Sequence, residues 1–192
     1  MVCREVAVTV PPVAAHVGAD SDSGTLSARL VAHLTAAGET IAAAESLTAG
    51  LVAATVADTP GASLVLRGAV VAYAADLKVE LLGVPGSLVD EAGTVDPRVA
   101  RAMAEGVRDR LGATWGVSTT GVAGPGPAEG KPAGTVHVAV AGPAGTVTRA
   151  LRLNGGRPQV RAAATEAALT LALDVMTGNA KPLRPPESHG VR

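Results

Sequence analysis

Apolar residues recur along this chain in two spacings, one typical of helices and one typical of strands. The clearest helical stripe is formed by Val99, Met103 and Val107, which recur every four residues and would share one face of a helix. Asp96 and Pro97 come just before this stripe, as an N-terminal capping residue and a first-turn proline do. The pattern therefore predicts a helix that starts at residue 97.

The same reading of the whole chain predicts an alternation of helices and strands. Glycines at positions 38 and 83 mark two of the helix ends. Runs of β-branched and other apolar residues mark the strands. The expected helices cover residues 26–37, 51–57, 76–82, 97–111 and the segment from 158 onward, and the expected strands cover 41–44, 64–73, 115–120, 135–140 and 146–153.

This alternation predicts the fold class. Strands that alternate with helices are typical of layered α/β folds, and the last two strands, joined around residues 142–145, are expected to form a hairpin. We predict an α/β protein, a single three-layer α/β/α sandwich around a mixed β-sheet, over residues 24–176. Residues 1–23 and 177–192 contain prolines without stable periodicity, so we expect flexible tails there.

Composition narrows the function classes. The chain has 192 residues, the size of one domain, and a net charge of −1, which argues against a nucleic-acid partner. Its single cysteine, Cys3, excludes an intramolecular disulfide and a cysteine-ligated zinc site. No apolar run reaches the length of a membrane span. We expect a cytoplasmic homo-oligomer that binds a small molecule, with no metal, cofactor or membrane partner.

A serine lies at the junction between the strand at 41–44 and the helix at 51–57. Ser46 at such a turn could act as a simple helix cap, or it could present its hydroxyl beside free backbone N–H groups. The N–H groups of residues 47–50 could then stabilise a developing oxyanion. This places Thr48, Ala49 and Gly50 among the candidate binding residues.

Two rare residue types point to the partners of this serine. The chain has no Phe, one Trp and one Tyr, and Tyr73 falls at the end of a predicted strand. Lys78 follows about one helical turn later, in a chain whose basic residues are mostly arginine. A desolvated lysine can serve as a base, whereas arginine stays protonated. Ser46, Tyr73 and Lys78 are therefore the candidate catalytic set, although Tyr73 could also be a packed aromatic residue and Lys78 a solvated one.

A glycine-rich loop and two arginines complete the candidate site. The strand at 115–120 runs into residues 119–127, which lack the Gly-Lys-Ser/Thr ending of a P-loop. Such a loop either approaches a ligand through its backbone or is purely structural. Arginines near the start of the last helix suit a phosphate group. The candidate ligand-binding residues are Thr120, Gly121, Ala123, Gly124, Arg157 and Arg161.

These motifs occur in an order that is similar to a known family. The chain resembles, over about residues 25–176, the C-terminal domain family of the competence/damage-inducible protein CinA. The resemblance rests on several motifs together, which makes it more specific than any single one. They are residues 44–50, the Arg67-Gly68 strand that ends at Tyr73, Lys78, residues 120–125, residues 131–136 and residues 157–161.

The resemblance implies an activity. Active members are nicotinamide-nucleotide amidases, which convert nicotinamide mononucleotide to nicotinate mononucleotide and ammonia in pyridine nucleotide salvage. It implies Ser46 as the nucleophile, assisted by Lys78 and Tyr73, which agrees with the chemistry of these residue types. The family usually has glycine where this chain has Ala49. A methyl group there could crowd the oxyanion region, and a positive φ would strain it by about 1–3 kcal/mol.

Two alternatives follow from this departure and from the unknown substrate. The same catalytic residues could act on a different amide. The domain could instead be a catalytically silent nucleotide-binding or assembly module.

Overall fold

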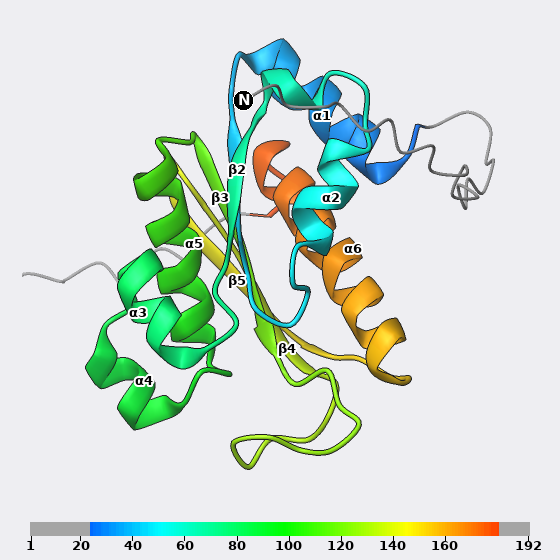
Figure 1. The fold of residues 1–192 in the computed structure, drawn as a ribbon. Helices are drawn as coiled ribbons and strands as arrows, with labels where there is room; N and C mark the ends of the chain where they lie inside the picture. Colours follow the sequence, from blue (N-terminus) through cyan, green and yellow to red (C-terminus); the bar gives the residue numbers. More distant parts are fainter. Residues whose placement is uncertain (1–23, 181–192) are drawn as a thin grey trace, which may run out of the picture.

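The computed structural model describes residues 24–180, in which a five-stranded mixed sheet lies between two layers of helices (Figure 1). The strand order is β2-β1-β3-β4-β5. The first three strands in this order run parallel to one another, and β4 and β5 are added antiparallel. The bounds are β1 Ile41–Glu45, β2 Leu66–Val71, β3 Trp115–Gly121, β4 Thr135–Gly142 and β5 Gly145–Arg152.

Helices cover both faces of the sheet (Figure 1). One layer contains α1, α2 and α6, and the other contains α3, α4 and α5. The predicted three-layer α/β sandwich with a mixed sheet is thus confirmed. The bounds are α1 Leu26–Ala37, α2 Leu51–Ala57, the short 3₁₀ helix η1 Ala62–Leu64, α3 Ala75–Leu82, α4 Gly86–Ala92, α5 Pro97–Leu111 and α6 Arg157–Met176.

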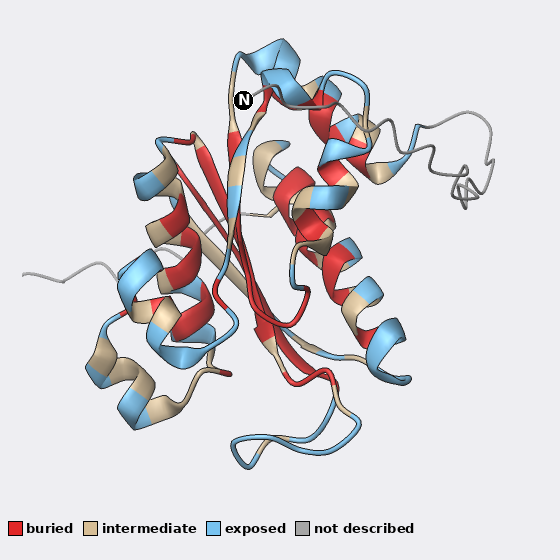
Figure 2. Ribbon diagram, viewed as in Figure 1, coloured by how far each residue is buried: buried red, intermediate tan, exposed pale blue. Residues whose placement is uncertain are grey.

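The sheet is buried on both faces because each layer supplies its own apolar core. Every residue of β1 and β4 is buried, and the buried sides of the helices face the sheet (Figure 2). Leu30, Leu34 and Leu171 belong to the core under α1, α2 and α6. Met103 and Val107 belong to the core under α3 and α5. With few aromatic residues, the centre of the sheet is built from alanine and valine.

The predicted helix signals hold for α5. The Asp96 carboxylate accepts a hydrogen bond of 2.8 Å from the N–H of Arg98, and Pro97 occupies the first turn. Gly112 ends the helix with φ 58°, a left-handed conformation that favours glycine. Val99, Met103 and Val107 are all fully buried, as the stripe predicts.

Two segments differ from the prediction. The strand expected over 64–73 is shorter, because Gly61 turns the chain into η1 and Leu64, 69% exposed, lies in that turn. The helix α4 was not predicted. It has only seven residues, none of which is buried, so its sequence carries no helical apolar stripe.

The expected tails fall largely beyond the described residues. Residues 1–23, with Cys3, and residues 181–192 lie outside them. Residues 177–180 are described, and the N–H of Ala180 donates a hydrogen bond to the carbonyl of Asp174 at the end of α6. Among the helices of residues 24–180, none combines the length and apolar character that crossing a membrane requires.

Candidate active site

The candidate site lies where the parallel strands end, at the lower edge of the sheet in Figure 1. Ser46 follows β1, Tyr73 follows β2 by two residues, and Gly121 ends β3. A cleft of about 380 Å³ opens there, and we call it the serine cleft. Six of the candidate residues line it: Ser46, Tyr73, Gly121, Ala123, Gly124 and Arg157.

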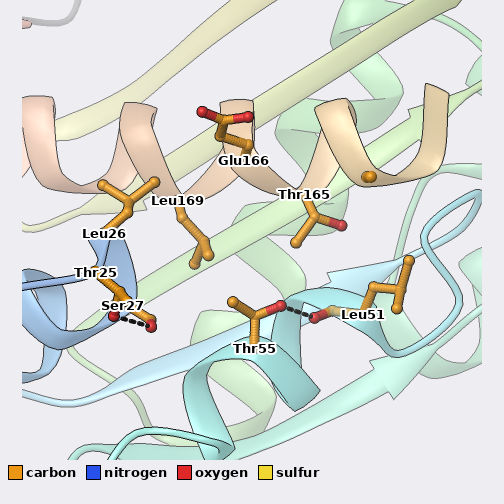
Figure 3. Close-up of a pocket in the computed structure, with 9 residues that line it drawn as sticks. Thr25, Leu26, Ser27, Leu51, Thr55, Thr165, Glu166 and Leu169 are labelled. Atoms are coloured by element: carbon orange, nitrogen blue, oxygen red, sulfur yellow. Dashed lines mark hydrogen bonds between the residues drawn. The ribbon is translucent and has the colours of Figure 1, made fainter. Parts of the chain in front are cut away.

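A second cavity of about 380 Å³ lies between α1, α2 and α6 (Figure 3). Apolar side chains and hydroxyl groups line most of it, and the hydroxyl of Thr55 is already bonded to the carbonyl of Leu51. Glu166 is its one ionisable lining residue. None of the candidate residues lines this cavity, whereas six of them line the serine cleft.

Ser46 occupies a fixed turn with its hydroxyl available. Its N–H donates to the carbonyl of Thr119 at 3.0 Å, and its carbonyl accepts from the N–H of Ala49 at 3.1 Å. The residue is 8% exposed and lines the serine cleft. Within residues 24–180 its Oγ makes no hydrogen bond. Backbone contacts therefore hold the serine turn, while the hydroxyl has no hydrogen-bond partner among the described residues.

Glu45, the residue before the serine, was not among the predicted site residues. Its carboxylate is fully buried and accepts hydrogen bonds from the N–H groups of Gly50, Val52 and Ala53 at 2.8, 3.1 and 2.9 Å. An anion at a helix N-terminus is stabilised by the helix dipole as well as by these bonds. The start of α2 is therefore already occupied by a charge from the protein itself.

This capping limits which backbone groups can meet an oxyanion. The N–H of Gly50 binds Glu45, the N–H of Ala49 donates to Ser46, and the N–H of Leu51 donates to the carbonyl of Thr48 at 3.3 Å. In the described part of the chain, the N–H groups of Leu47 and Thr48 make no hydrogen bond. Of the two, Leu47 lines the serine cleft, whereas Thr48 is fully buried and does not. The N–H of Leu47 is therefore the candidate oxyanion donor of the serine loop, residues 46–50.

Ala49 has the positive φ that would strain it. Its φ is 49°, and that of Gly50 is 95°. The left-handed conformation costs a non-glycine residue about 1–2 kcal/mol. The side chain of Ala49 is exposed and does not line the serine cleft, so its methyl group does not crowd the oxyanion region.

Lys78 is buried next to the serine turn. It is 1% exposed, and its Nζ donates to the carbonyls of Ala72 and Tyr73 at 2.8 and 3.1 Å. Ala72 is next to the serine turn in the sheet, because its N–H donates to the carbonyl of Glu45 at 2.9 Å. Across residues 24–180, no hydrogen bond joins the Nζ of Lys78 to the Oγ of Ser46. The amine therefore lies beside the serine turn but is bonded to backbone carbonyls.

Burial changes the protonation of this lysine. Desolvation lowers the pKa of Lys78 below its ordinary 10.5, and the negative charges of Glu129 and Asp76 partly oppose this change. A lowered pKa increases the fraction of neutral amine, which is the form that accepts a proton. The environment of Lys78 thus favours a base.

Tyr73 and Arg157 meet at the mouth of the serine cleft. The hydroxyl of Tyr73, a residue that is 53% exposed, accepts a hydrogen bond of 2.6 Å from Nη2 of Arg157. The Nη1 of Arg157 donates to the carbonyl of Gly124 at 3.1 Å. One guanidinium thus bridges the end of β2 and the glycine-rich loop.

Arg161, one turn further along α6, contacts the serine loop instead. Its Nε donates to the carbonyl of Leu47 at 2.9 Å and its Nη2 to the carbonyl of Thr48 at 2.7 Å. It does not line the serine cleft. The two arginines that the sequence placed together therefore serve different parts of the site.

The buried threonines of the site form hydrogen bonds between the segments that surround the serine cleft. The hydroxyls of Thr48 and Thr119 are hydrogen-bonded to each other at 2.7 Å and are fully buried. The hydroxyl of Thr120, also buried, donates to the carbonyl of Thr94 at 2.7 Å. Neither Thr48 nor Thr120 lines the serine cleft. Their hydroxyls instead join neighbouring segments of the chain behind it.

Glu129 anchors the segment that follows the glycine-rich loop, and no pattern in the sequence pointed to it. Its carboxylate accepts from the N–H of Thr94 at 2.7 Å, the hydroxyl of Thr94 at 2.6 Å and the N–H of Val95 at 3.2 Å. Burial opposes ionisation of Glu129, but these hydrogen bonds outweigh it and lower its pKa. The residue also lines the serine cleft, to which it adds a negative charge.

Comparison with known proteins identifies the family. The sequence model of the CinA C-terminal domain matches residues 23–176. A CinA-like protein of Frankia casuarinae is 52% identical over 139 residues, 72% of this chain but 32% of that protein. A CinA-like protein of Gloeobacter violaceus is 50% identical over 157 residues, 80% of this chain and 36% of its own length. The chain thus spans about a third of these relatives.

Solved structures agree with the sequence comparison. The competence/damage inducible protein CihA of Agrobacterium tumefaciens has 33% identity and a TM-score of 0.76, with 79% of this chain and 93% of that one covered. A CinA superfamily protein of Escherichia coli has 28% identity and a TM-score of 0.76, with 78% and 88% covered. On sequence and fold together, this chain belongs to the CinA C-terminal domain family.

Proposed function

We propose that the serine cleft hydrolyses the carboxamide of nicotinamide mononucleotide, giving nicotinate mononucleotide and ammonia. The observation that carries this proposal is the pairing of a free Ser46 hydroxyl in the cleft with a buried Lys78 amine on the neighbouring carbonyls. A serine is a weak nucleophile until a base takes its proton, and a lysine of lowered pKa is such a base. Family membership supports the same reaction.

The acylation step uses these two residues. The neutral amine of Lys78 accepts the hydroxyl proton of Ser46 as the Oγ bonds to the carboxamide carbon. To do so, Nζ must turn from its carbonyl partners toward the serine, which the flexible lysine chain allows. The ammonium that results is stabilised when Nζ returns to the carbonyls of Ala72 and Tyr73, while the N–H of Leu47, which lines the cleft, binds the oxyanion.

Collapse of the tetrahedral intermediate completes the cycle. The C–N bond breaks, and the leaving nitrogen takes the proton from Lys78 and departs as ammonia. The nicotinate moiety remains as an ester on Ser46. Water then attacks this ester, Lys78 takes a proton from the water and returns one to the Oγ, and nicotinate mononucleotide leaves.

Arg157 is the group that we assign to the nucleotide phosphate. It lines the serine cleft at its mouth, and its contacts to Tyr73 and Gly124 are exposed bonds that a phosphate can replace. Guanidinium groups bind phosphate in a bidentate way. Arg161 is the poorer candidate because its guanidinium is already bonded to two carbonyls.

The test is product analysis on a panel of amides. We expect the purified protein to release ammonia and nicotinate mononucleotide in equal amounts from nicotinamide mononucleotide, and far less ammonia from nicotinamide, its riboside, glutamine and asparagine. Turnover of another amide alone would show that the same catalytic residues serve a different substrate.

One observation favours a second function, a nucleotide-binding module without turnover. No hydrogen bond joins Lys78 and Ser46 in the described part of the chain. Calorimetry separates the two functions, because the silent module would bind nicotinamide mononucleotide and release no ammonia. In that case Ala49→Gly would be the variant to test for restored activity.

A further inference from the structure

Two opposite charges line the serine cleft. Of the described residues that line it, only Glu129 and Arg157 carry a charge at neutral pH. Arg157 lies at the mouth, where it is bonded to the hydroxyl of Tyr73 and the carbonyl of Gly124. Glu129 comes from a different part of the chain, a turn that follows the glycine-rich loop. A ligand that fills this cleft therefore meets one cation and one anion.

The turn that carries Glu129 has a defined backbone. Ala128 and Lys131 exchange two backbone hydrogen bonds of 3.0 and 2.9 Å, which close a two-residue turn at Glu129 and Gly130. The two central residues have positive φ, 52° and 70°, as in tight turns that favour asparagine and glycine. A glutamate is unusual in such a position, and hydrogen bonds from its carboxylate to the loop before α5 compensate for it.

The carboxylate of Glu129 is ionised and has an acceptor position left for a ligand. Burial opposes its ionisation, but hydrogen bonds from the N–H and hydroxyl of Thr94 and from the N–H of Val95 outweigh this and lower its pKa. A carboxylate has about four acceptor positions, and these bonds use three of them. The residue as a whole is exposed. A side chain at position 93 would collide with the carboxylate, so Gly93 leaves it this place.

The negative charge of Glu129 acts on the residues around the serine turn. Desolvation lowers the pKa of Lys78, and Glu129 is the strongest of the charges that raise it. The amine of Lys78 is bonded to the carbonyls of Ala72 and Tyr73 beside the serine turn. A positive group bound in the cleft next to Ser46 would lie in the same field.

We propose that Glu129 selects ligands with a positively charged ring, by stabilising the pyridinium of nicotinamide mononucleotide in the serine cleft. This rests on the proposed function, which brings the carboxamide to Ser46 and the phosphate to Arg157. The ring nitrogen of this nucleotide is bonded to ribose, so the ring is cationic at every pH, while the phosphate is anionic. The two charges of the ligand thus find the two opposite charges of the cleft.

A structural role of Glu129 has a different signature. If the carboxylate only fixed the loop before α5, its loss would weaken every ligand of the cleft alike. A charge contact instead distinguishes ligands by the charge of the ring. The reduced, dihydro form of nicotinamide mononucleotide keeps the carboxamide, ribose and phosphate but has a neutral ring, which makes it the matched ligand.

The first experiment measures binding by calorimetry in Ser46→Ala, which cannot form an acyl-enzyme. We expect nicotinamide mononucleotide to bind roughly 3–10-fold more tightly than its reduced form, as for a partly exposed charge pair. Adding Glu129→Gln should remove this preference by weakening the cationic form alone. Equal affinity for the two forms with Glu129 in place, no binding of either form, or an equal loss for both in Glu129→Gln would each overturn the proposal.

Two further variants serve as matched controls. Asp76 also raises the pKa of Lys78 but does not line the serine cleft, so Asp76→Asn should keep the preference for the cationic ring. Thr94→Val removes one hydrogen bond to the carboxylate and leaves its charge, so any loss of affinity should be the same for both forms. Loss of the preference in Asp76→Asn would contradict the assignment to Glu129.

The second experiment separates failure of this inference from failure of the proposed function. Because the ring charge is present in both ground and transition states, Glu129→Gln should raise KM for nicotinamide mononucleotide roughly 3–10-fold and change kcat by less than about 3-fold. A wild type that prefers the cationic form but releases no ammonia would refute the reaction and leave the role of Glu129 intact. Ammonia release with equal affinity for the two forms would refute the role of Glu129 alone.

Discussion

Ala49 is the residue at which this chain departs from the glycine usual in its family, and its conformation explains what the departure costs. Its φ of 49° lies in the left-handed region, while its methyl group is exposed outside the serine cleft. The departure therefore bears on stability more than on the space available to substrate. The possible strain could be anticipated from the sequence, but the direction of the methyl group could not, because it depends on how the serine loop folds over α2.

Ala49→Gly should stabilise the fold. Relief of left-handed strain gives about 1–2 kcal/mol, and the added freedom of glycine in the unfolded chain removes about 0.5–1 kcal/mol. We expect a net gain of about 0.5–1 kcal/mol in the free energy of unfolding, measured by urea denaturation. Ala54→Gly, an exposed alanine inside α2, is the matched control and should lose about 0.5–1 kcal/mol. A loss in both variants would show that Ala49 is unstrained.

The helix α2 shows how an element can depend on one residue outside it. It has seven residues, too few to be stable alone, and its N-terminal N–H groups bind the buried carboxylate of Glu45. The apolar pattern predicts the helix over residues 51–57, as observed, but not this cap. Capping residues usually directly precede the helix, whereas Glu45 lies at the end of β1 and is separated from α2 by the serine loop.

Replacing Glu45 by Gln tests this cap. The amide keeps the size of the side chain but removes the charge and replaces one acceptor by a donor that faces N–H groups. We expect the free energy of unfolding to fall by about 1.5–3 kcal/mol, the range for hydrogen bonds to a charged group. Glu80→Gln on the exposed side of α3 is the control and should change it by less than about 0.5 kcal/mol. Equal effects of the two variants would argue against the cap.

Across the whole molecule, the sheet order decides which residues meet. Because β1 pairs in parallel with both β2 and β3, Ser46, Tyr73 and Gly121 reach the same edge. For Ser46 and Tyr73 this follows from the strand ends that the sequence predicts, whereas the position of Gly121 beside them depends on the strand order. The contacts of Arg161 with Leu47 and of Glu129 with Thr94 could not be predicted. They join side chains to backbone groups of distant loops, whose positions depend on the packing of the complete fold.

The buried lysine should make the stability of the whole domain depend on pH. Desolvation lowers the pKa of Lys78 in the folded state below 10.5, so the unfolded chain binds more protons between these two values. Stability then rises with pH from the lowered pKa up to 10.5. We expect this rise in urea unfolding of the wild type relative to Lys78→Met, which lacks the titrating group. Parallel pH profiles of the two proteins would contradict a lowered pKa.

The central claim is that Ser46 is the nucleophile of an amidase, and ammonia release by Ser46→Ala tests it most directly. The variant removes only the hydroxyl, and Ser87→Ala on the exposed side of α4 serves as the matched control. Removing a serine nucleophile typically costs orders of magnitude in kcat. We expect ammonia release from nicotinamide mononucleotide to fall at least about 10³-fold in Ser46→Ala and to remain normal in Ser87→Ala; full release by Ser46→Ala would contradict the mechanism.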